Sequence, residues 1–289
     1  MFLNRGDLQA IERISYELCE DEAAENVLYF ETRFSPHFLC NTRKHPFQAD
    51  PLSNDSPTAV TPEDVVRAVS RGLKRGETDF SIKARMILCT IKGHSGWSSD
   101  VVRMATEMKA EGVVAIDIAG DESVYSDEER AAFETAFSRG IHRTIHAGEQ
   151  GPPTNVAYAV KKLHAERIGH GYSVVQSAEI YEMCRSRGVH FECCPYSSLY
   201  TSAVKRGEGA GKHPIVIFAE DDTNFSVSKD DSTVTQTTLP IEYQLLQRMG
   251  LTELHLVRAN FNAARSCFLP EEEKRQLLEQ LKQVYHFAQ

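Results

Sequence analysis

The sequence predicts an α/β fold in which parallel strands are covered by helices on both faces. Two observations indicate this class. Strand-like segments alternate with helical segments along all 289 residues, which is typical of consecutive βα units. The strand over Val113–Ala119 is apolar on both faces and is interrupted only at Asp117, and strands of this kind are buried between two layers of helix.

Local signals place the individual elements. Apolar residues recur at helical spacing over Leu8–Cys19. A helix opens at Thr61, because Thr61 can cap it and Pro62 needs no N–H partner in the first turn. Seven strands are expected, over Asn26–Phe34, Lys83–Ile91, Val113–Ala119, Ile141–His146, Arg167–His170, Val189–Cys194 and Phe225–Ser228. Further helices are expected over Ser99–Ala110, Asp127–Ser138, Asn155–Leu163, Ala178–Ser186, Pro240–Met249, Thr252–Arg265 and Glu271–Tyr285, with loops over Asn41–Val60 and Pro195–Pro214.

The strand count bears on the architecture. A closed (β/α)8 barrel has eight strands, and the first residues of this chain read as a helix. We therefore expect a single barrel domain over residues 1–289 in which seven of the eight strands are present and the first β/α unit is missing. An open sheet is the alternative. A doubly wound fold would carry a glycine-rich phosphate turn after its first strand, and this sequence has none there.

Composition limits the partners of the protein. The net charge is −9 and no basic patch is evident, which argues against nucleic acid and anionic membranes. No apolar run approaches the roughly 18 residues of a membrane span, and we expect no signal peptide in the first residues of this sequence. The seven cysteines are odd in number and scattered, which favours a reducing, cytoplasmic setting. The sequence leaves the oligomeric state open.

Ionisable residues follow six of the predicted strands. In a barrel enzyme the catalytic groups lie at the carboxyl ends of the strands. The stretch from Thr144 to Glu149 delivers His146 and Glu149 there, provided that Gly148 bends the chain. The other strand ends carry Arg33, Ser35 and His37, then Asp121 and Glu122, then His170, then Glu192, and finally Asp230 and Asp231.

These residue types suit a hydrolytic metal site. Imidazole and carboxylate groups are zinc ligands, and a catalytic zinc site keeps one position for water. Zinc lowers the pKa of bound water to about 7, and Glu149 would carry protons. Glu192 is interpreted either as a partner that orients His170 or as a buried salt-bridge residue. Asp117 is interpreted as a partner in the core, and Cys193 with Cys194 as buried thiols.

The same motifs resemble the adenosine deaminase family over nearly the whole chain. The resemblance rests on five stretches in order: Ala115–Glu122, Thr144–Glu149, Arg167–Tyr172, Phe191–Pro195 and Ser228–Asp231. It implies a zinc-bearing barrel that hydrolyses adenosine and deoxyadenosine to the inosine product and ammonia in purine salvage. The ligand would be a small purine nucleoside.

The resemblance also implies a role for each matching residue. His146 and Asp230 are implied as zinc ligands. Glu149 is implied as the acid that protonates the purine ring nitrogen beside the attacked carbon, and His170 as the group that orients and stabilises the attacking hydroxide. Gly120 and Asp231 are implied as contacts of the purine ring.

Two departures from the family pattern leave alternatives open. The family's first strand carries a His-x-His pair, and none occurs in these 289 residues. A catalytically impaired isoform that lacks these ligands is therefore one alternative. A deaminase of another 6-aminopurine, such as a nucleotide or an N6-methylated purine, is another, with Arg33 and Lys229 as the candidate phosphate contacts. Lys229 also stands where the family has an uncharged residue, so we expect it to add a charge near the metal.

Overall fold

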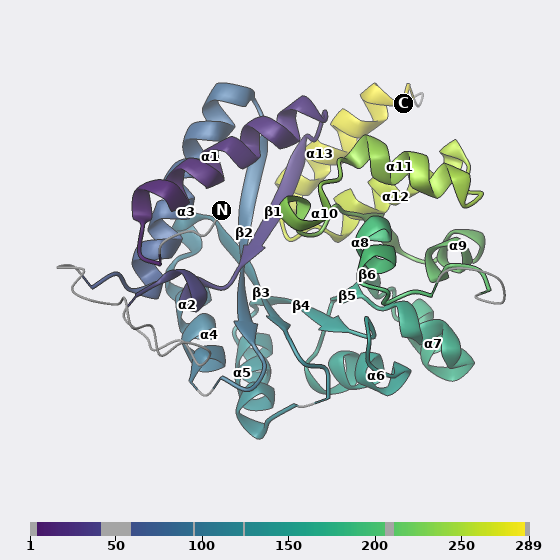
Figure 1. Ribbon diagram of the computed structural model, residues 1–289, viewed down its shortest axis with the longest axis horizontal. Coiled ribbons are helices and arrows are strands. Elements are labelled where there is room, and N and C mark those ends of the chain that lie inside the picture. The colour runs from purple at the N-terminus through teal and green to yellow at the C-terminus, as the bar shows by residue number, and fades with distance from the viewer. Residues whose placement is uncertain (1–4, 42–58, 95, 124, 206–210, 287–289) are drawn as a thin grey trace.

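The computed structural model describes residues 5–41, 59–94, 96–123, 125–205 and 211–286. Within these ranges seven parallel strands form one curled sheet in chain order, with helices around its outer side (Figure 1). The predicted fold class and the seven strands are confirmed. The strands are β1 (Tyr29–Phe34), β2 (Lys83–Ile91), β3 (Val113–Ala119), β4 (His142–Ala147), β5 (Arg167–His170), β6 (His190–Cys193) and β7 (Phe225–Val227).

Helices connect consecutive strands, as parallel pairing requires. The long helices between strands are α1 (Leu8–Ala24) before β1, then α3 (Pro62–Phe80), α4 (Trp97–Glu107), α5 (Asp127–Ser138), α6 (Pro153–Lys162), α7 (Ala178–Ser186) and α9 (Pro214–Glu220). Three helices close the chain: α11 (Leu239–Arg248), α12 (Glu253–Ser266) and α13 (Glu271–Val284). The short segments are α2 (Pro36–Leu39), α8 (Pro195–Tyr200), α10 (Ser232–Thr235), and the 3₁₀ turns η1 (Lys109–Glu111) and η2 (Tyr172–Gln176).

The start of α3 shows how the sequence fixes a helix boundary. The Thr61 side chain accepts a hydrogen bond from the N–H of Asp64, and the Asp64 carboxylate accepts one from the N–H of Thr61. This reciprocal pair satisfies two N–H groups that the first turn leaves free. The predicted cap at Thr61 is confirmed. The predicted loop over Asn41–Val60 lies mostly outside the described residues.

The predicted loop after β6 is partly wrong. Pro195 occupies the first turn of α8, where its missing N–H costs nothing, so six residues of that loop are helical. Helix α9 begins at Pro214 and is capped by His213, whose Nδ1 accepts from the N–H of Ile215. Histidine is outside the usual set of capping residues, and for this reason the start of α9 could not be predicted from a local signal.

The two faces of the curled sheet differ in chemistry. Toward the helices, large apolar side chains such as Met86, Leu88 and Ile118 are fully buried, and this burial drives the packing of helix on sheet. The concave side instead holds a chain of buried and partly buried charges: Glu31, Arg33, Asp117, Arg167 and Glu192. Buried ions are tolerated only when each one is paired, and here every member has an opposite charge as its neighbour.

Strands β1 and β7 are the two ends of the sheet within the described ranges. Helix α1 and the loop after β7 are tied together by Lys229, whose Nζ lies 2.7 Å from Oε1 of Glu22 and 2.9 Å from Oε1 of Glu25. The second carboxylate oxygen of Glu25 accepts a hydrogen bond from the N–H of Leu239. The first and last parts of the fold are therefore joined by a buried ion triad.

The seven cysteines are all buried and free of disulfides. They are distributed from Cys19 on α1 to Cys267 at the end of α12, so the expectation of buried thiols at Cys193 and Cys194 is confirmed. None of the helices in the described ranges is both long and apolar enough to span a membrane.

Candidate active site

The strand ends that the sequence singled out surround one cavity of about 870 Å³. Its walls come from the carboxyl ends of β3, β4 and β5, from α8, and from the segment between β7 and α10. The topology accounts for this convergence, because the carboxyl ends of parallel strands meet at one edge of the sheet. All six residues predicted for the site border the cavity: Gly120, His146, Glu149, His170, Asp230 and Asp231.

His146 is held from behind by a carboxylate. Its Nδ1 lies 2.9 Å from Oδ2 of Asp117, which is fully buried on β3. Burial lowers the pKa of His146, but the negative charge of Asp117 outweighs it and leaves the pKa raised. A Cβ on Gly169 would lie 3.3 Å from the His146 ring, so the glycine leaves room for the imidazole. With Nδ1 engaged, Nε2 is the nitrogen left for a ligand.

His170 has an unusual backbone and an unusual environment. Its φ is +63°, in the left-handed region that costs a residue with a side chain about 1–2 kcal/mol. The Nδ1 atom is buried and has no hydrogen-bond partner in the described part of the chain. Burial, followed by the nearby charge of His146, lowers the pKa of His170 to about 4. The ring is therefore neutral at pH 7.

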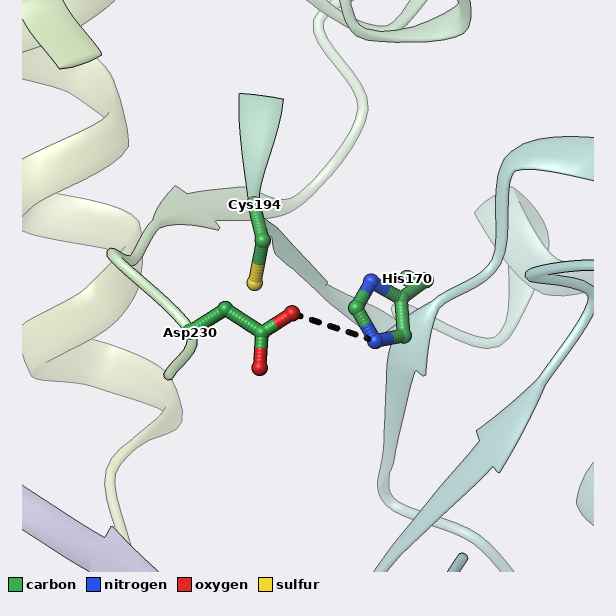
Figure 2. Close-up of side chains that lie close together, drawn as sticks. All are labelled: His170, Cys194 and Asp230. Carbon is green, nitrogen blue, oxygen red and sulfur yellow. Dashed lines mark ion pairs between the residues drawn. The ribbon is translucent and has the colours of Figure 1, made fainter. Parts of the chain in front are cut away.

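Two carboxylates face the other nitrogen of that ring. Nε2 of His170 lies 3.6 Å from Oε2 of Glu149 and 3.9 Å from Oδ2 of Asp230. Figure 2 shows the Asp230 carboxylate directed at the His170 ring from the loop after β7. These distances leave the three groups close but not directly hydrogen-bonded.

Glu149 reaches the cavity because the chain turns at Gly148. The φ of Gly148 is +73°, and a Cβ there would lie 2.6 Å from Cγ2 of Val156. The bend expected from the sequence is confirmed, and only glycine fits it. Burial raises the pKa of the Glu149 carboxyl, and a raised pKa favours the protonated form that a general acid needs.

Asp230 and Asp231 follow β7 and are both exposed to the cavity mouth. Asp230 is a second site residue in the left-handed region, with φ +61°. Asp231 stands at the N-cap position of α10, but its side chain makes no capping hydrogen bond. Its carboxylate therefore remains available to a ligand.

The contacts of Glu192 decide between the two interpretations of this residue, a partner that orients His170 or a buried salt-bridge residue. Its carboxylate accepts hydrogen bonds from Arg33, from Nε of Arg167 at 2.6 Å, and from Oγ1 of Thr144 at 3.0 Å. Burial would raise the pKa of Glu192, but the two guanidinium groups hold it well below its usual range. Glu192 is a buried salt-bridge residue, and the structure gives it no contact with His170.

Several other predicted strand-end residues have structural partners. Arg33 donates to Asp117 and Glu192 on the concave side of the sheet. His37 is fully buried, with Nε2 lying 3.0 Å from Oδ2 of Asp100. Lys229 is not among the residues that line the cavity, and its Nζ is paired with Glu22 and Glu25. The expectation that it adds a charge near the metal stays a prediction.

The structure adds Cys194 to the site, and it gives a defined contact to Glu122, to which the sequence assigned no role. The ligand atoms of His170, Cys194 and Asp230 lie within 4.8 Å of one another, and Figure 2 shows the Cys194 sulfur beside the Asp230 carboxylate. Glu122 borders the cavity and contacts the loop that carries Glu149. The signal in the sequence that points to both residues is their position after a strand, Cys194 after β6 and Glu122 after β3.

The donor atoms suit a divalent transition metal. His146, His170 and Asp230 border the same cavity, and imidazole and carboxylate are zinc ligands in kind. Among the described residues, however, the ligand atoms that lie within 4.8 Å of one another belong to His170, Cys194 and Asp230, and His146 is outside this group. Cys194 is the weaker candidate, because burial and then the charge of Asp230 raise the pKa of its thiol well above the usual range. A thiol must lose its proton before it binds metal.

A curled parallel sheet with acids and imidazoles at its strand ends defines a hydrolase of the metal-dependent amidohydrolase class. Solved structures support this fold. An N6-mAMP deaminase from Arabidopsis superposes with a TM-score of 0.80 at 25% identity, covering 96% of this chain and 79% of that one. An amidohydrolase from Burkhoderia ambifaria with bound Zn superposes with a TM-score of 0.79 at 24% identity, covering 99% of this chain and 76% of that one.

The chain belongs to the adenosine deaminase family, whose model matches residues 6–284. The adenosine deaminase of Danio rerio is 44% identical over 289 residues, which covers 99% of this chain and 79% of the relative. That of Gallus gallus is 45% identical over 283 residues and covers 97% of this chain and 77% of the relative. The family is one of hydrolytic deaminases, so the predicted enzyme class is confirmed.

Proposed function

We propose that this protein hydrolyses adenosine and deoxyadenosine to the corresponding inosine product and ammonia, as a step of purine salvage. One observation supports this most directly. Two imidazoles and three carboxylates, carried by the ends of β4, β5 and β7, border one cavity in a member of the adenosine deaminase family. Neutral imidazole beside a carboxyl with raised pKa is the combination that hydrolysis of an aromatic amine requires.

Each residue has a distinct task in this proposal. Burial raises the pKa of Glu149, which favours its protonated form, and in this proposal Glu149 donates a proton to the purine ring nitrogen next to the amino-bearing carbon. The carbon then becomes more electrophilic. His170, neutral at pH 7, can accept a hydrogen bond and so orients the attacking water. Asp231 and the backbone at Gly120 contact the purine edge.

The cofactor in this proposal is zinc, held by His146 and Asp230. When bound, zinc supplies a water that ionises near neutral pH. Asp117 keeps the His146 imidazole in a fixed orientation through Nδ1, which is how a carboxylate partner usually supports a metal-binding histidine. A catalytic zinc site has three protein ligands, and this proposal names two of them, because His170 is assigned to the attacking water.

The cavity favours a nucleoside over a nucleotide. Five of the described residues that line it are acids: Asp121, Glu122, Glu149, Asp230 and Asp231. No lysine or arginine is among those lining residues. The two cationic side chains that were the candidate phosphate contacts form ion pairs with other residues. Arg33 pairs with Asp117 and Glu192, and Lys229 with Glu22 and Glu25. A phosphate group would therefore meet uncompensated negative charge.

The test is turnover by the purified 289-residue chain in the presence of zinc. We expect adenosine to lose its absorbance with release of inosine and ammonia, and AMP to react at least about 100-fold more slowly, given typical costs of an unpaired charge. Glu149→Gln should abolish most of the activity while zinc content stays unchanged. A folded, zinc-loaded chain that leaves adenosine intact would contradict the proposal.

A further inference from the structure

The loop that carries Glu149 is held by two charged side chains from neighbouring strand ends. On one side, the Glu122 carboxylate accepts hydrogen bonds from three consecutive backbone N–H groups, those of Gly148 at 2.5 Å, Glu149 at 2.9 Å and Gln150 at 3.0 Å. On the other side, Nζ of Lys92 lies 3.5 Å from the carbonyl oxygen of His146. The turn from β4 is thus fixed at both its carbonyl and its amide groups.

Glu122 is itself anchored. Nδ2 of Asn155, on α6, donates to the backbone oxygen of Glu122 at 2.8 Å and approaches its Oε2 at 3.5 Å. A Cβ on Gly151 would lie 2.6 Å from that same Oε2, so the loop closes tightly over the carboxylate. Lys92 is buried, and its Nζ lies 4.2 Å from the centre of the Tyr125 ring.

The hydrogen bonds that the Glu122 carboxylate accepts are stronger than ordinary backbone hydrogen bonds. A carboxylate that accepts several amide hydrogen bonds forms charge-assisted contacts, each about twice as strong as a neutral one. Burial alone would raise the pKa of Glu122, but the backbone hydrogen bonds hold it below its usual value. The carboxylate is therefore ionised at neutral pH and keeps all three amides.

The Glu149 side chain needs this support. Its carboxylate lies 3.6 Å from Nε2 of His170, which is beyond a normal hydrogen bond. Its place in the cavity is consequently set from the backbone. A shift of about 1 Å in a catalytic group can cost on the order of 100-fold in rate, so whatever fixes this backbone also sets the efficiency of proton transfer.

We infer that Glu122 is a positioning residue for Glu149, acting through the three backbone amides of the loop after β4. This inference rests on the proposed function of Glu149 as the proton donor. Glu122 does not touch the substrate in this role. It determines where the Glu149 carboxyl stands relative to the ring nitrogen that is protonated.

The first experiment compares Glu122→Gln with Glu134→Gln. Both substitutions replace one carboxylate by an amide, but Glu134 is exposed on α5, accepts from Arg130 and is not among the residues that line the cavity. In Glu122→Gln the new NH₂ group cannot accept from an amide. We expect its kcat to fall about 10- to 100-fold with KM changed less than about threefold, while Glu134→Gln keeps kcat within about twofold.

A second readout separates positioning from general damage. An adenosine analogue with carbon in place of the protonated ring nitrogen cannot accept a proton from Glu149. Its inhibition constant should be the same for the wild type and for Glu122→Gln. If the inhibition constant of the analogue rises in Glu122→Gln by the same factor by which kcat/KM for adenosine falls, the pocket as a whole has been disturbed and the inference is wrong.

The third measurement does not depend on activity. Hydrogen exchange at the amides of residues 148–150 should be faster in Glu122→Gln than in the wild type by about tenfold or more, and unchanged in Glu134→Gln. Unchanged exchange in Glu122→Gln would overturn the inference. If the wild type leaves adenosine intact, the proposed function fails, yet the exchange experiment still decides whether Glu122 holds the loop.

Asn155→Ala serves as a reserve if Glu122→Gln does not fold. It removes the anchor of Glu122 rather than Glu122 itself. We expect the same changes in smaller measure, namely faster exchange at residues 148–150 and a kcat lowered by about threefold to tenfold. Exchange at wild-type rates in Asn155→Ala would count against the inference.

Discussion

Nδ1 of His146 lies 2.9 Å from Oδ2 of Asp117, a fully buried carboxylate on the adjacent strand. The contact determines which imidazole nitrogen carries hydrogen and which can bind a metal. In Asp117→Asn the amide can donate to Nδ1 and favour the opposite tautomer. We expect zinc affinity to fall about 10- to 100-fold, measured by competition with a chelator.

Glu192→Gln is the matched control for this substitution. Glu192 shares Arg33 with Asp117 but does not contact His146. The variant should lower the free energy of unfolding and leave zinc affinity within about twofold of the wild type. Equal loss of zinc in both variants would mean that Asp117 acts only through the buried charge network.

The backbone at His170 can be tested apart from its imidazole. Because its φ is +63°, asparagine is tolerated there, whereas a β-branched residue is strained. His170→Asn and His170→Val should both lose at least about 100-fold in kcat. Urea unfolding should show His170→Val to be less stable than His170→Asn by about 1–2 kcal/mol. Equal stabilities would contradict the assigned backbone conformation.

Lys229→Met tests the ion triad between α1 and the loop after β7. The substitution leaves Glu22 and Glu25 buried without their cation, so we expect a loss of about 3 kcal/mol in the free energy of unfolding. Adding Glu22→Gln to Lys229→Met should recover a part of that loss. The exposed pair Lys212–Glu220 is the comparison, because Lys212→Met should cost less than about 1 kcal/mol.

Glu242 should make stability depend on pH. The side chain is fully buried on α11, and burial raises its pKa to about 7. The folded state therefore holds a proton that the unfolded chain releases near pH 4.5. Stability from this group is fully present below that pH and is lost as pH rises through 7, by about 3 kcal/mol in total.

Glu242→Gln should remove this dependence. The free energy of unfolding of the variant should rise relative to that of the wild type as the pH increases from 5 to 8. Urea unfolding at both pH values measures this difference. Glu220 is exposed on α9, so Glu220→Gln should leave the pH profile of the wild type unchanged. A wild-type profile that rises toward pH 8 through Glu242 would contradict the assigned pKa.

Much of the fold was predictable because the signals were local. Alternating apolar strands, the helix cap at Thr61 and the glycine bend at Gly148 each depend on a few neighbouring residues. The convergence of His146, Glu149, His170 and Asp230 on one cavity followed from a general rule of parallel sheets. These parts of the sequence analysis needed no knowledge of long-range contacts.

What could not be predicted was the choice of partners over long sequence distances. Lys229 was expected to act near the metal, but it pairs with Glu22, more than 200 residues away in sequence. In the sequence Glu122 is only an acid at a strand end, because the three backbone amides point toward it only in the folded loop. Alternation and spacing do not specify such side-chain directions.

The seven buried cysteines also provide a set of internal reporters. Burial raises the pKa of Cys19 to about 12 and that of Cys184 and Cys267 to about 11, and alkylating reagents attack thiolates. Each of these three thiols therefore reacts with the reagent only after the segment around it has opened. Alkylation rates resolved by mass spectrometry would yield an opening free energy for α1, α7 and the end of α12 separately. A nucleoside in the cavity would slow the labelling of Cys194 and leave that of Cys19 unaltered.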